Sequence, residues 1–179
     1  MVYILLAPGF EEAEALVPAD MLRRANIETA LVSLDGAPVP GSHGVTVTAD
    51  GTLDKLDRSK ADMVVLPGGP GHKNLGKDPR VEQLVREAAG QGRWVAAICA
   101  APTLLGGWGL LEGKNAVCYP GMEAGLIGAQ AKMDRSVVVD GKLITGRAAG
   151  SAFDFGLTLV EVLTGKEEAD KIRNGIHYK

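Results

Sequence analysis

Four short apolar runs constrain the fold of this chain more than any other feature of its sequence. They occupy residues 3–7, 30–34, 63–66 and 95–98, and none shows an alternation of apolar and polar residues. Strands of this kind are buried on both faces, which is typical of a parallel sheet covered by helices. The sequence therefore predicts a mainly parallel sheet.

Helical patterns separate these runs. Asp78 followed by Pro79 predicts a helix start, and apolar residues at helical spacing continue from there to Gly90. A second apolar helix is expected over residues 151–165, with Ser151 and Asp154 as a capping-box-like start. Residues 45–48 and 137–143 are expected to form hairpin or edge strands. With right-handed crossovers, this order predicts a flavodoxin-like three-layer α/β sandwich with small β-hairpin additions.

The whole chain limits the partners that we expect. It has 179 residues, a hydrophobic fraction of 46% and a formal net charge of -3, and no linker-like segment divides it. We expect one domain over residues 1–179, no membrane partner and no nucleic acid, because the basic residues form no stripe. The apolar run at residues 2–7 is too short for the core of a signal peptide. The two cysteines form no C-x-x-C pair, so we expect no metal, no disulfide framework and a reducing cytoplasm.

Cys99 is the first candidate for chemistry. It follows the run 95–98 and precedes Pro102, which suits the first turn of a helix. Ligands of parallel sheets bind at the carboxyl ends of strands, and a helix N-terminus there favours the thiolate. The alternative is a buried cysteine that packs as a small apolar residue. We favour the functional thiol.

Glu14 is the second candidate. Helical spacing places its carboxyl against Val17, Pro18 and Met21, and burial there raises the pKa of a carboxyl, which could then donate a proton. The alternative is that the acidic residues at positions 11, 12 and 14 only favour a helix N-terminus.

The glycine-rich loop after the third run is a third candidate. The backbone N–H groups of the Gly68-Gly69 turn, together with the N–H of Ala100, could stabilise an oxyanion. The loop lacks the lysine and hydroxyl of a phosphate-binding P-loop, which argues against a nucleotide. Of the three histidines, His72 lies nearest this loop in sequence, and we expect it to be solvated surface rather than a catalytic base. Cys118 has no comparable context, so we expect a core thiol.

Several motifs, taken together, resemble the ThiJ/PfpI superfamily and, within it, the DJ-one or protein deglycase branch. They are Gly9-Phe10-Glu11-Glu12-Ala13-Glu14, Val64-Val65-Leu66-Pro67-Gly68-Gly69, Ala97-Ile98-Cys99-Ala100-Ala101-Pro102, and Thr145-Gly146-Arg147 with Phe153 and Phe155. The resemblance runs from Val2 to about Lys166 and implies a flavodoxin-like homodimer. It also implies that Cys99 is paired with a protonated Glu14 and that the oxyanion donors are Gly69 and Ala100.

Members of this branch are described as glutathione-independent glyoxalases, as deglycases, and as oxidative-stress sensors or chaperones. The sequence departs from other relatives. Ala100 stands where the proteases of the superfamily place histidine, and His177 is not followed by the x-Glu of glutamine amidotransferases. Tyr119 stands where some DJ-one members carry a histidine near the pocket. These departures argue against protease and glutaminase activity.

The resemblance and the residues together predict an enzyme without metal or organic cofactor. In this hypothesis Cys99 attacks methylglyoxal, glyoxal or their adducts with amines and thiols, and Glu14 moves protons. The alternative is a binding and sensing protein in which Cys99 is oxidised to sulfenic and then sulfinic acid. The two hypotheses share every site residue.

Overall fold

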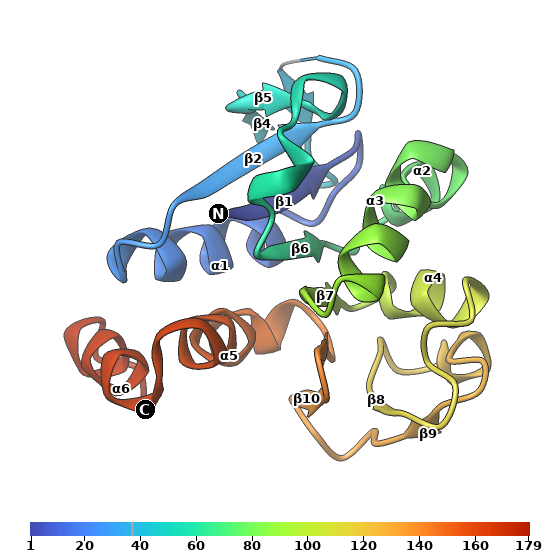
Figure 1. The fold of residues 1–179 in the computed structure, drawn as a ribbon. Helices are drawn as coiled ribbons and strands as arrows, with labels where there is room; N and C mark the ends of the chain where they lie inside the picture. Colours follow the sequence, from blue (N-terminus) through green and yellow to red (C-terminus); the bar gives the residue numbers. More distant parts are fainter. Residues whose placement is uncertain (37) are drawn as a thin grey trace.

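The protein is described here by a computed structural model that covers residues 1–36 and 38–179. Its main sheet has seven strands in the order β10-β11-β7-β6-β1-β2-β5 (Figure 1). Neighbouring strands run parallel except β10, which is antiparallel to β11. The strands of this sheet are β1 (Val2–Leu6), β2 (Thr29–Ser33), β5 (Gly51–Thr52), β6 (Met63–Leu66), β7 (Trp94–Ile98), β10 (Val137–Asp140) and β11 (Leu143–Gly146). The four apolar runs in the sequence are therefore strands β1, β2, β6 and β7, within one residue at each end.

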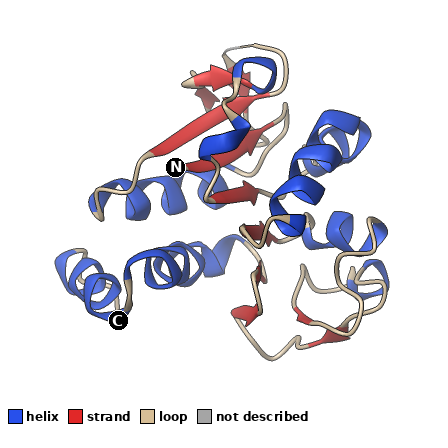
Figure 2. Cartoon of the chain, viewed as in Figure 1, coloured by secondary structure: helices blue, strands red, loops and turns tan. Residues whose placement is uncertain are grey.

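Helices cover both faces of this sheet, as Figure 2 shows in blue. They are α1 (Glu12–Arg24), α2 (His72–Lys77), α3 (Pro79–Gly90), α4 (Pro102–Gly107), α5 (Ala152–Thr164) and α6 (Lys166–Gly175), with single 3-10 turns η1 (Leu53–Lys55), η2 (Arg58–Lys60), η3 (Glu123–Gly125) and η4 (Ala149–Ser151). Successive side chains of β1 enter different cores. Ile4 packs with residues of α1, α5 and α6, whereas Leu5 packs with residues of α2, α3 and α4. The expected three-layer, flavodoxin-like α/β fold is confirmed.

The helix signals in the sequence were correct at one helix and partly wrong at another. The side chain of Asp78 accepts a hydrogen bond of 2.9 Å from the N–H of Arg80, and Pro79 is the first residue of α3. Ser151 precedes α5 but makes no side-chain capping bond, so the expected capping box is absent there. The 3-10 turn η4 leads into α5 instead. Gly165, with a φ of 97°, ends α5 as expected.

The region after residue 136 differs from the expected edge hairpin. Strands β10 and β11 do pair around Asp140 and Gly141, but β11 extends to Gly146 and pairs in parallel with β7. All four residues of β11 are buried, so it is a strand of the core sheet. Helix α6 was not predicted, because residues 166–175 are mostly charged and only Ala169 and Ile172 are buried.

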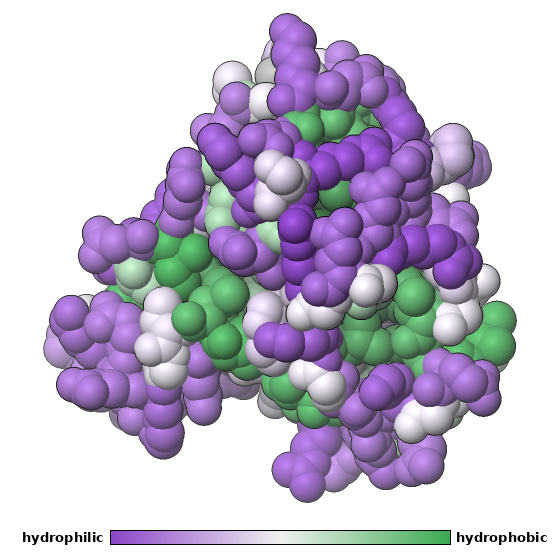
Figure 3. Space-filling model, viewed as in Figure 1, coloured by the Kyte–Doolittle hydropathy of each residue, from purple (hydrophilic) through white to green (hydrophobic). Residues whose placement is uncertain are grey.

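Two short strand pairs lie outside the main sheet. Strands β3 (Val39–Pro40) and β4 (Thr46–Val47) form an antiparallel hairpin in the region where a strand was expected. Strands β8 (Asn115–Ala116) and β9 (Gln130–Ala131) pair in parallel. The face of the molecule in Figure 3 is mostly hydrophilic, with hydrophobic areas between α1 and α5 and over α4.

Candidate functional site

Cys99 lies at a sharp turn between β7 and α4. Its φ is 65°, a left-handed conformation that is costly for a residue with a side chain. Two backbone hydrogen bonds hold this conformation: the N–H of Cys99 donates to the carbonyl of Gly146 at 2.9 Å, and the N–H of Tyr119 donates to the carbonyl of Cys99 at 2.7 Å. The expected strand-to-helix turn is confirmed, and its strained residue is the cysteine itself.

Glu14 lies on the first turns of α1 and has no exposed surface. Its Oε2 accepts a hydrogen bond of 2.9 Å from the N–H of Gly68, whereas its Oε1 is buried and has no partner within the part of the chain that the structure describes. Burial raises the pKa of Glu14 to about 7, against the opposing effects of hydrogen bonds from Cys99 and Gly68. A buried carboxyl with one unpartnered oxygen is suited to keep a proton.

The thiol of Cys99 is buried beside this carboxyl, with 8% of the residue exposed. Burial, followed by the negative charge of an ionised Glu14, raises the pKa of Cys99 to about 12, although hydrogen bonds from the N–H groups of Gly69 and Ala100 lower it. This direction is opposite to that expected from a helix N-terminus. The helix α4 has only six residues and begins at Pro102, so its dipole contributes little to the sulfur.

Glu14 and Cys99 consequently titrate as a pair. An ionised Glu14 repels a thiolate, whereas a protonated Glu14 removes that repulsion and can donate a hydrogen bond to the sulfur. One proton shared between these two groups gives either a carboxylate with a thiol or a carboxylic acid with a thiolate. The second arrangement would provide a thiolate, and the N–H groups of Gly69 and Ala100 favour that form because they lower the pKa of Cys99.

Gly68 and Gly69 allow the backbone to come this close. A Cβ atom on Gly68 would lie 2.7 Å from both the Cβ of Cys99 and Oε2 of Glu14. Gly69 has a φ of 74°, and a Cβ there would lie 2.6 Å from the backbone nitrogen of Glu11. The sequence motif therefore brings together β6, β7 and α1 through residues that have no side chain.

Comparison with known proteins agrees with this geometry. The model of the DJ-1/PfpI family matches residues 1–162. The chain belongs to the DJ-1/PfpI family. It is 40% identical over 176 residues to the protein dj-1beta of Drosophila melanogaster, covering 97% of this chain and 94% of that protein. The crystal structure of Drosophila melanogaster DJ-1beta has a TM-score of 0.94 and 38% identity, and the match covers 99% of this chain and 97% of that one.

The name of a third relative states an enzymatic activity. It is the glutathione-independent glyoxalase DJR-1.2 of Caenorhabditis elegans, 30% identical over 170 residues, or 94% of this chain and 91% of that protein. No helix in the described part of this DJ-1/PfpI chain is long and apolar enough to span a bilayer.

Other residues considered from the sequence lie outside the Glu14–Cys99 contact of this family member. Nδ1 of His72 lies 2.8 Å from the carbonyl oxygen of Gly69, at the start of α2, so the ring is tied to the loop backbone. Cys118 is fully buried and packs on the α3 side of the sheet, as expected of a core thiol, whereas Cys99 packs on the other side. Tyr119 is half exposed, and its backbone holds the turn at Cys99.

The structure shows a polar cluster at the start of α1 that the sequence did not predict. Oε1 of Glu12 accepts a hydrogen bond of 2.7 Å from the N–H of His43, and the ring of His43 lies 3.1 Å from Oε2 of the same carboxylate. These contacts join α1 to the β3–β4 hairpin. Burial raises the pKa of Glu12, but hydrogen bonds from its own N–H, from His43 and from the N–H of Val45 together lower it to about 2. Glu11, Glu12 and His43 are also the residues of the described chain whose ligand atoms converge enough to hold a metal ion. Because Glu12 and His43 are 31 positions apart in the chain, no local motif could have shown this contact.

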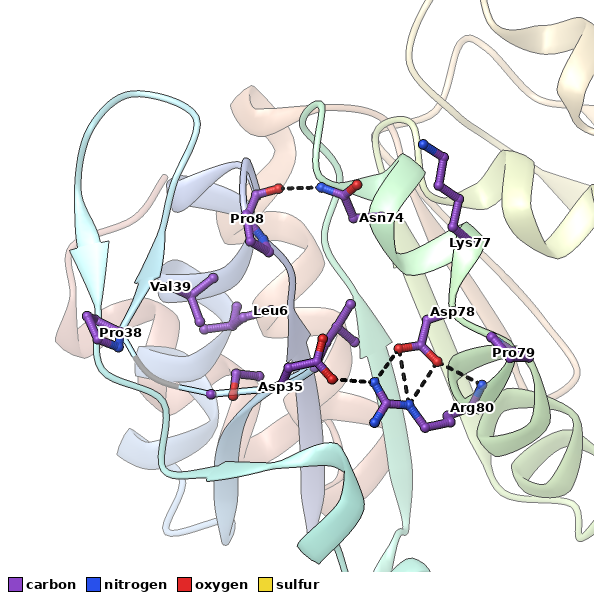
Figure 4. Close-up of a pocket in the computed structure, with 13 residues that line it drawn as sticks. Leu6, Pro8, Asp35, Pro38, Val39, Asn74, Lys77, Asp78, Pro79 and Arg80 are labelled. Atoms are coloured by element: carbon purple, nitrogen blue, oxygen red, sulfur yellow. Dashed lines mark hydrogen bonds and ion pairs between the residues drawn. The ribbon is translucent and has the colours of Figure 1, made fainter.

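One large cavity is not lined by any of the predicted site residues. It has a volume of about 660 Å³ and lies beyond the ends of β1 and β2, beside α2 and the start of α3 (Figure 4). Apolar residues such as Leu6, Pro8 and Val39 line it. At its polar side Arg80 forms ion pairs with Asp35 and Asp78, both at 2.6 Å.

Proposed function

We propose that this protein is a cysteine-dependent, glutathione-independent glyoxalase that acts on methylglyoxal and glyoxal. We further propose that it acts as a protein deglycase on the adducts of these compounds with amines and thiols. The observation that carries both proposals is the buried contact of Glu14 with Cys99, in which a carboxyl with a raised pKa stands beside a strained cysteine. The name of the relative DJR-1.2 supports the choice of reaction.

The reaction begins with a bond from the Cys99 sulfur to the aldehyde carbon of the substrate. The carbonyl oxygen becomes an oxyanion, which the N–H groups of Gly69 and Ala100 stabilise, and Glu14 supplies its proton to give a hemithioacetal. This assignment uses the same two N–H groups that lower the pKa of the free thiol.

Rearrangement of the hemithioacetal follows. Glu14 removes the proton from the carbon that is bonded to sulfur and returns a proton to the neighbouring carbon, which converts the adduct into a thioester. Water then hydrolyses the thioester, releasing lactate from methylglyoxal or glycolate from glyoxal and restoring Cys99. One carbon is oxidised and its neighbour is reduced, so the step needs no external oxidant, reductant or cofactor. Attack on the carbon that bears a glycated amine or thiol would release that group instead.

The first test is consumption of methylglyoxal by the purified protein without glutathione, with lactate measured as the product. We expect activity in the native protein and none in Cys99→Ser, because serine is not ionised by this environment. His72→Ala is the matched control, since its ring contacts the Gly69 carbonyl and not the Glu14–Cys99 pair. An inactive native protein that is correctly folded would refute the enzymatic proposal.

A second candidate function is that of an oxidative-stress sensor or redox-regulated chaperone, with Cys99 oxidised to sulfinic acid. The N–H groups of Gly69 and Ala100, which lower the pKa of Cys99, favour this candidate because they could also bind sulfinate oxygens. Suppression of the aggregation of an unfolded client protein, measured before and after oxidation by peroxide, tests it. A protein that oxidises at Cys99 but does not consume methylglyoxal would favour the sensor.

The assembly and compartment are part of the same proposal. We propose a homodimer, as the family resemblance implies, acting in the cytoplasm. Both cysteines are free, which suits a reducing compartment.

A further inference from the structure

A second cavity lies at the amino edge of the parallel sheet, opposite the edge that carries Cys99. Its volume is about 470 Å³. Four of its lining residues stand where neighbouring strands begin: Val2 in β1, Asp62 before β6, Trp94 in β7 and Lys142 before β11. Because all four strands run in the same direction, this cavity is separated from the Glu14–Cys99 contact by the length of the strands.

One side of the cavity is aliphatic. Val2 is fully buried, and Ile27, Val162 and Leu163 are partly buried and pack against the core. Ile27 follows α1, and the other two belong to the last turn of α5. Small-molecule sites are mostly apolar cavities of roughly 300–1,000 Å³ with a few polar groups that fix orientation, and this cavity lies in that range.

The other side of the cavity is cationic. Nζ of Lys142 lies 4.2 Å from the centre of the Trp94 ring, and no carboxylate of the described chain pairs with it. The guanidinium of Arg93 donates to the carbonyl oxygens of Arg58 and Ser59 at 2.6 and 3.2 Å, and among residues 1–36 and 38–179 no carboxylate forms an ion pair with it. The carboxylate in the lining, Asp62, pairs with the amino group of Met1. The lining therefore carries excess positive charge.

We propose that this cavity binds an aliphatic monocarboxylate, with the carboxylate beside Lys142 and the tail against Ile27, Val162 and Leu163. The orientation follows from charge. The side chains of Ile27, Val162 and Leu163 on the tail side of the lining offer no hydrogen-bond donor or positive charge to a carboxylate. At the sheet edge, the Lys142 ammonium can donate a charge-assisted hydrogen bond to the carboxylate while it stays over the Trp94 ring.

The chain supplies its own reporter for this site. It has two tryptophans, Trp94 in the cavity lining and Trp108 after α4. Trp108→Phe leaves Trp94 as the source of tryptophan fluorescence, and titration of this variant with octanoate is expected to change its emission in a saturable way. Calorimetric titration of the unmodified protein with octanoate measures the same binding without a substitution.

Variants and probes separate charge from apolar contact. We expect Lys142→Met to weaken octanoate binding about tenfold, the scale of one hydrogen bond to a charged group. Lys132→Met, a lysine outside the cavity, is the matched control and is expected to bind as the native protein does. Cys99→Ser is also expected to bind normally, because Cys99 lies at the other edge of the sheet.

Three results would overturn the proposal. The first is the absence of saturable octanoate binding by both fluorescence and calorimetry. The second is unchanged affinity in a folded Lys142→Met, or equal affinity for 1-octanol, either of which would mean that the carboxylate is not recognised. The third is equal affinity for acetate, which would mean that the aliphatic wall contributes nothing.

Discussion

The carboxyl of Glu14 and the thiol of Cys99 meet in a buried contact that joins α1 to the turn after β7, 85 positions apart in the chain. Neither group is in its ordinary state there. Burial raises the pKa of both. The charge of an ionised Glu14 raises the pKa of Cys99 further, whereas a hydrogen bond from Cys99 lowers that of Glu14. Their shared proton is the basis of the mechanism proposed above.

Glu14→Gln tests the use of that proton. Glutamine keeps the size of the side chain and a hydrogen-bond donor but cannot exchange a proton. We expect the variant to fold, to keep an oxidisable Cys99, and to lose about a hundredfold or more in glyoxalase rate, the usual scale of general acid-base catalysis. The rate with methylglyoxal is the measurement, and circular dichroism checks folding. A fully active Glu14→Gln together with an inactive His72→Ala would instead indicate a Cys–His reaction.

Glu14→Gln also tests the raised pKa of Glu14, because that pKa makes the free energy of unfolding depend on pH. The folded state holds the Glu14 proton more tightly than the unfolded state, since its pKa is about 7 rather than 4.5. The stabilisation from this proton is fully present below about pH 4.5 and is lost as the pH rises to about 7. Glu14→Gln does not titrate, so its free energy of unfolding is expected to rise relative to that of the native protein across this window. Urea unfolding at pH 4.5 to 8 measures the difference, and parallel curves would mean that Glu14 holds no extra proton.

Oxidation distinguishes the two cysteines. We expect dilute peroxide to add two oxygens to Cys99 while Cys118 stays reduced. Because burial raises the pKa of both thiols, access to peroxide separates them: Cys99 has some exposed surface, whereas Cys118 is fully buried. Peptide mass mapping gives the result, and preferential oxidation of Cys118 would contradict the assignment of the reactive thiol.

Most of the fold could be predicted because the central strands are continuous apolar runs that can be recognised in the sequence. Residues 63–66 are apolar throughout, and β6 has those bounds. Strand β11 was harder to predict, because residues 143–146 end in threonine and glycine, which are poor markers of a core strand. Thr145 is buried because its hydroxyl accepts a hydrogen bond from the N–H of Val117, a contact made only in the folded chain. Helix α6 depends in the same way on packing against α5.

The residues of the candidate site could be predicted from the sequence, but the pKa of Cys99 and the hydrogen bonds around the site could not. The predicted burial of Glu14 on a helix and its raised pKa are confirmed, but the carboxyl lies beside Gly68 and Cys99, which helical spacing could not show. The direction of the Cys99 pKa was predicted wrongly, because the sequence did not show that α4 begins only at Pro102 or that the thiol is buried next to Glu14. The hydrogen bond between Glu12 and the hairpin N–H of His43 likewise depends on tertiary structure.

The proposed homodimer has a direct test. Sedimentation of the purified protein at micromolar concentration is expected to give twice the mass of one 18.7 kDa chain. Symmetric dimers are the commonest assemblies of soluble proteins, and the family resemblance favours one here. A strict monomer would remove the dimer from the proposal without affecting the fold.

Gly68 offers the most local test of the site, because it lies against both reactive groups. A Cβ added there would lie 2.7 Å from the Cβ of Cys99 and from Oε2 of Glu14, and 3.0 Å from the backbone nitrogen of Ala100. Real contacts of a Cβ atom are longer, so Gly68→Ala has to push these groups apart. Because catalytic groups displaced by even one ångström lose much of their effect, we expect about a hundredfold lower glyoxalase rate.

Gly90→Ala is the matched control for this substitution. Gly90 is the last residue of α3, and a Cβ there would have no neighbour within 4 Å. Alanine also has a higher helix propensity than glycine, so this variant is expected to be as active as the native protein and slightly more stable. Both variants are compared by methylglyoxal kinetics and thermal unfolding. If Gly68→Ala were folded and fully active, the spacing of Glu14, Cys99 and Ala100 would not matter for the reaction, and the mechanism proposed here would be wrong.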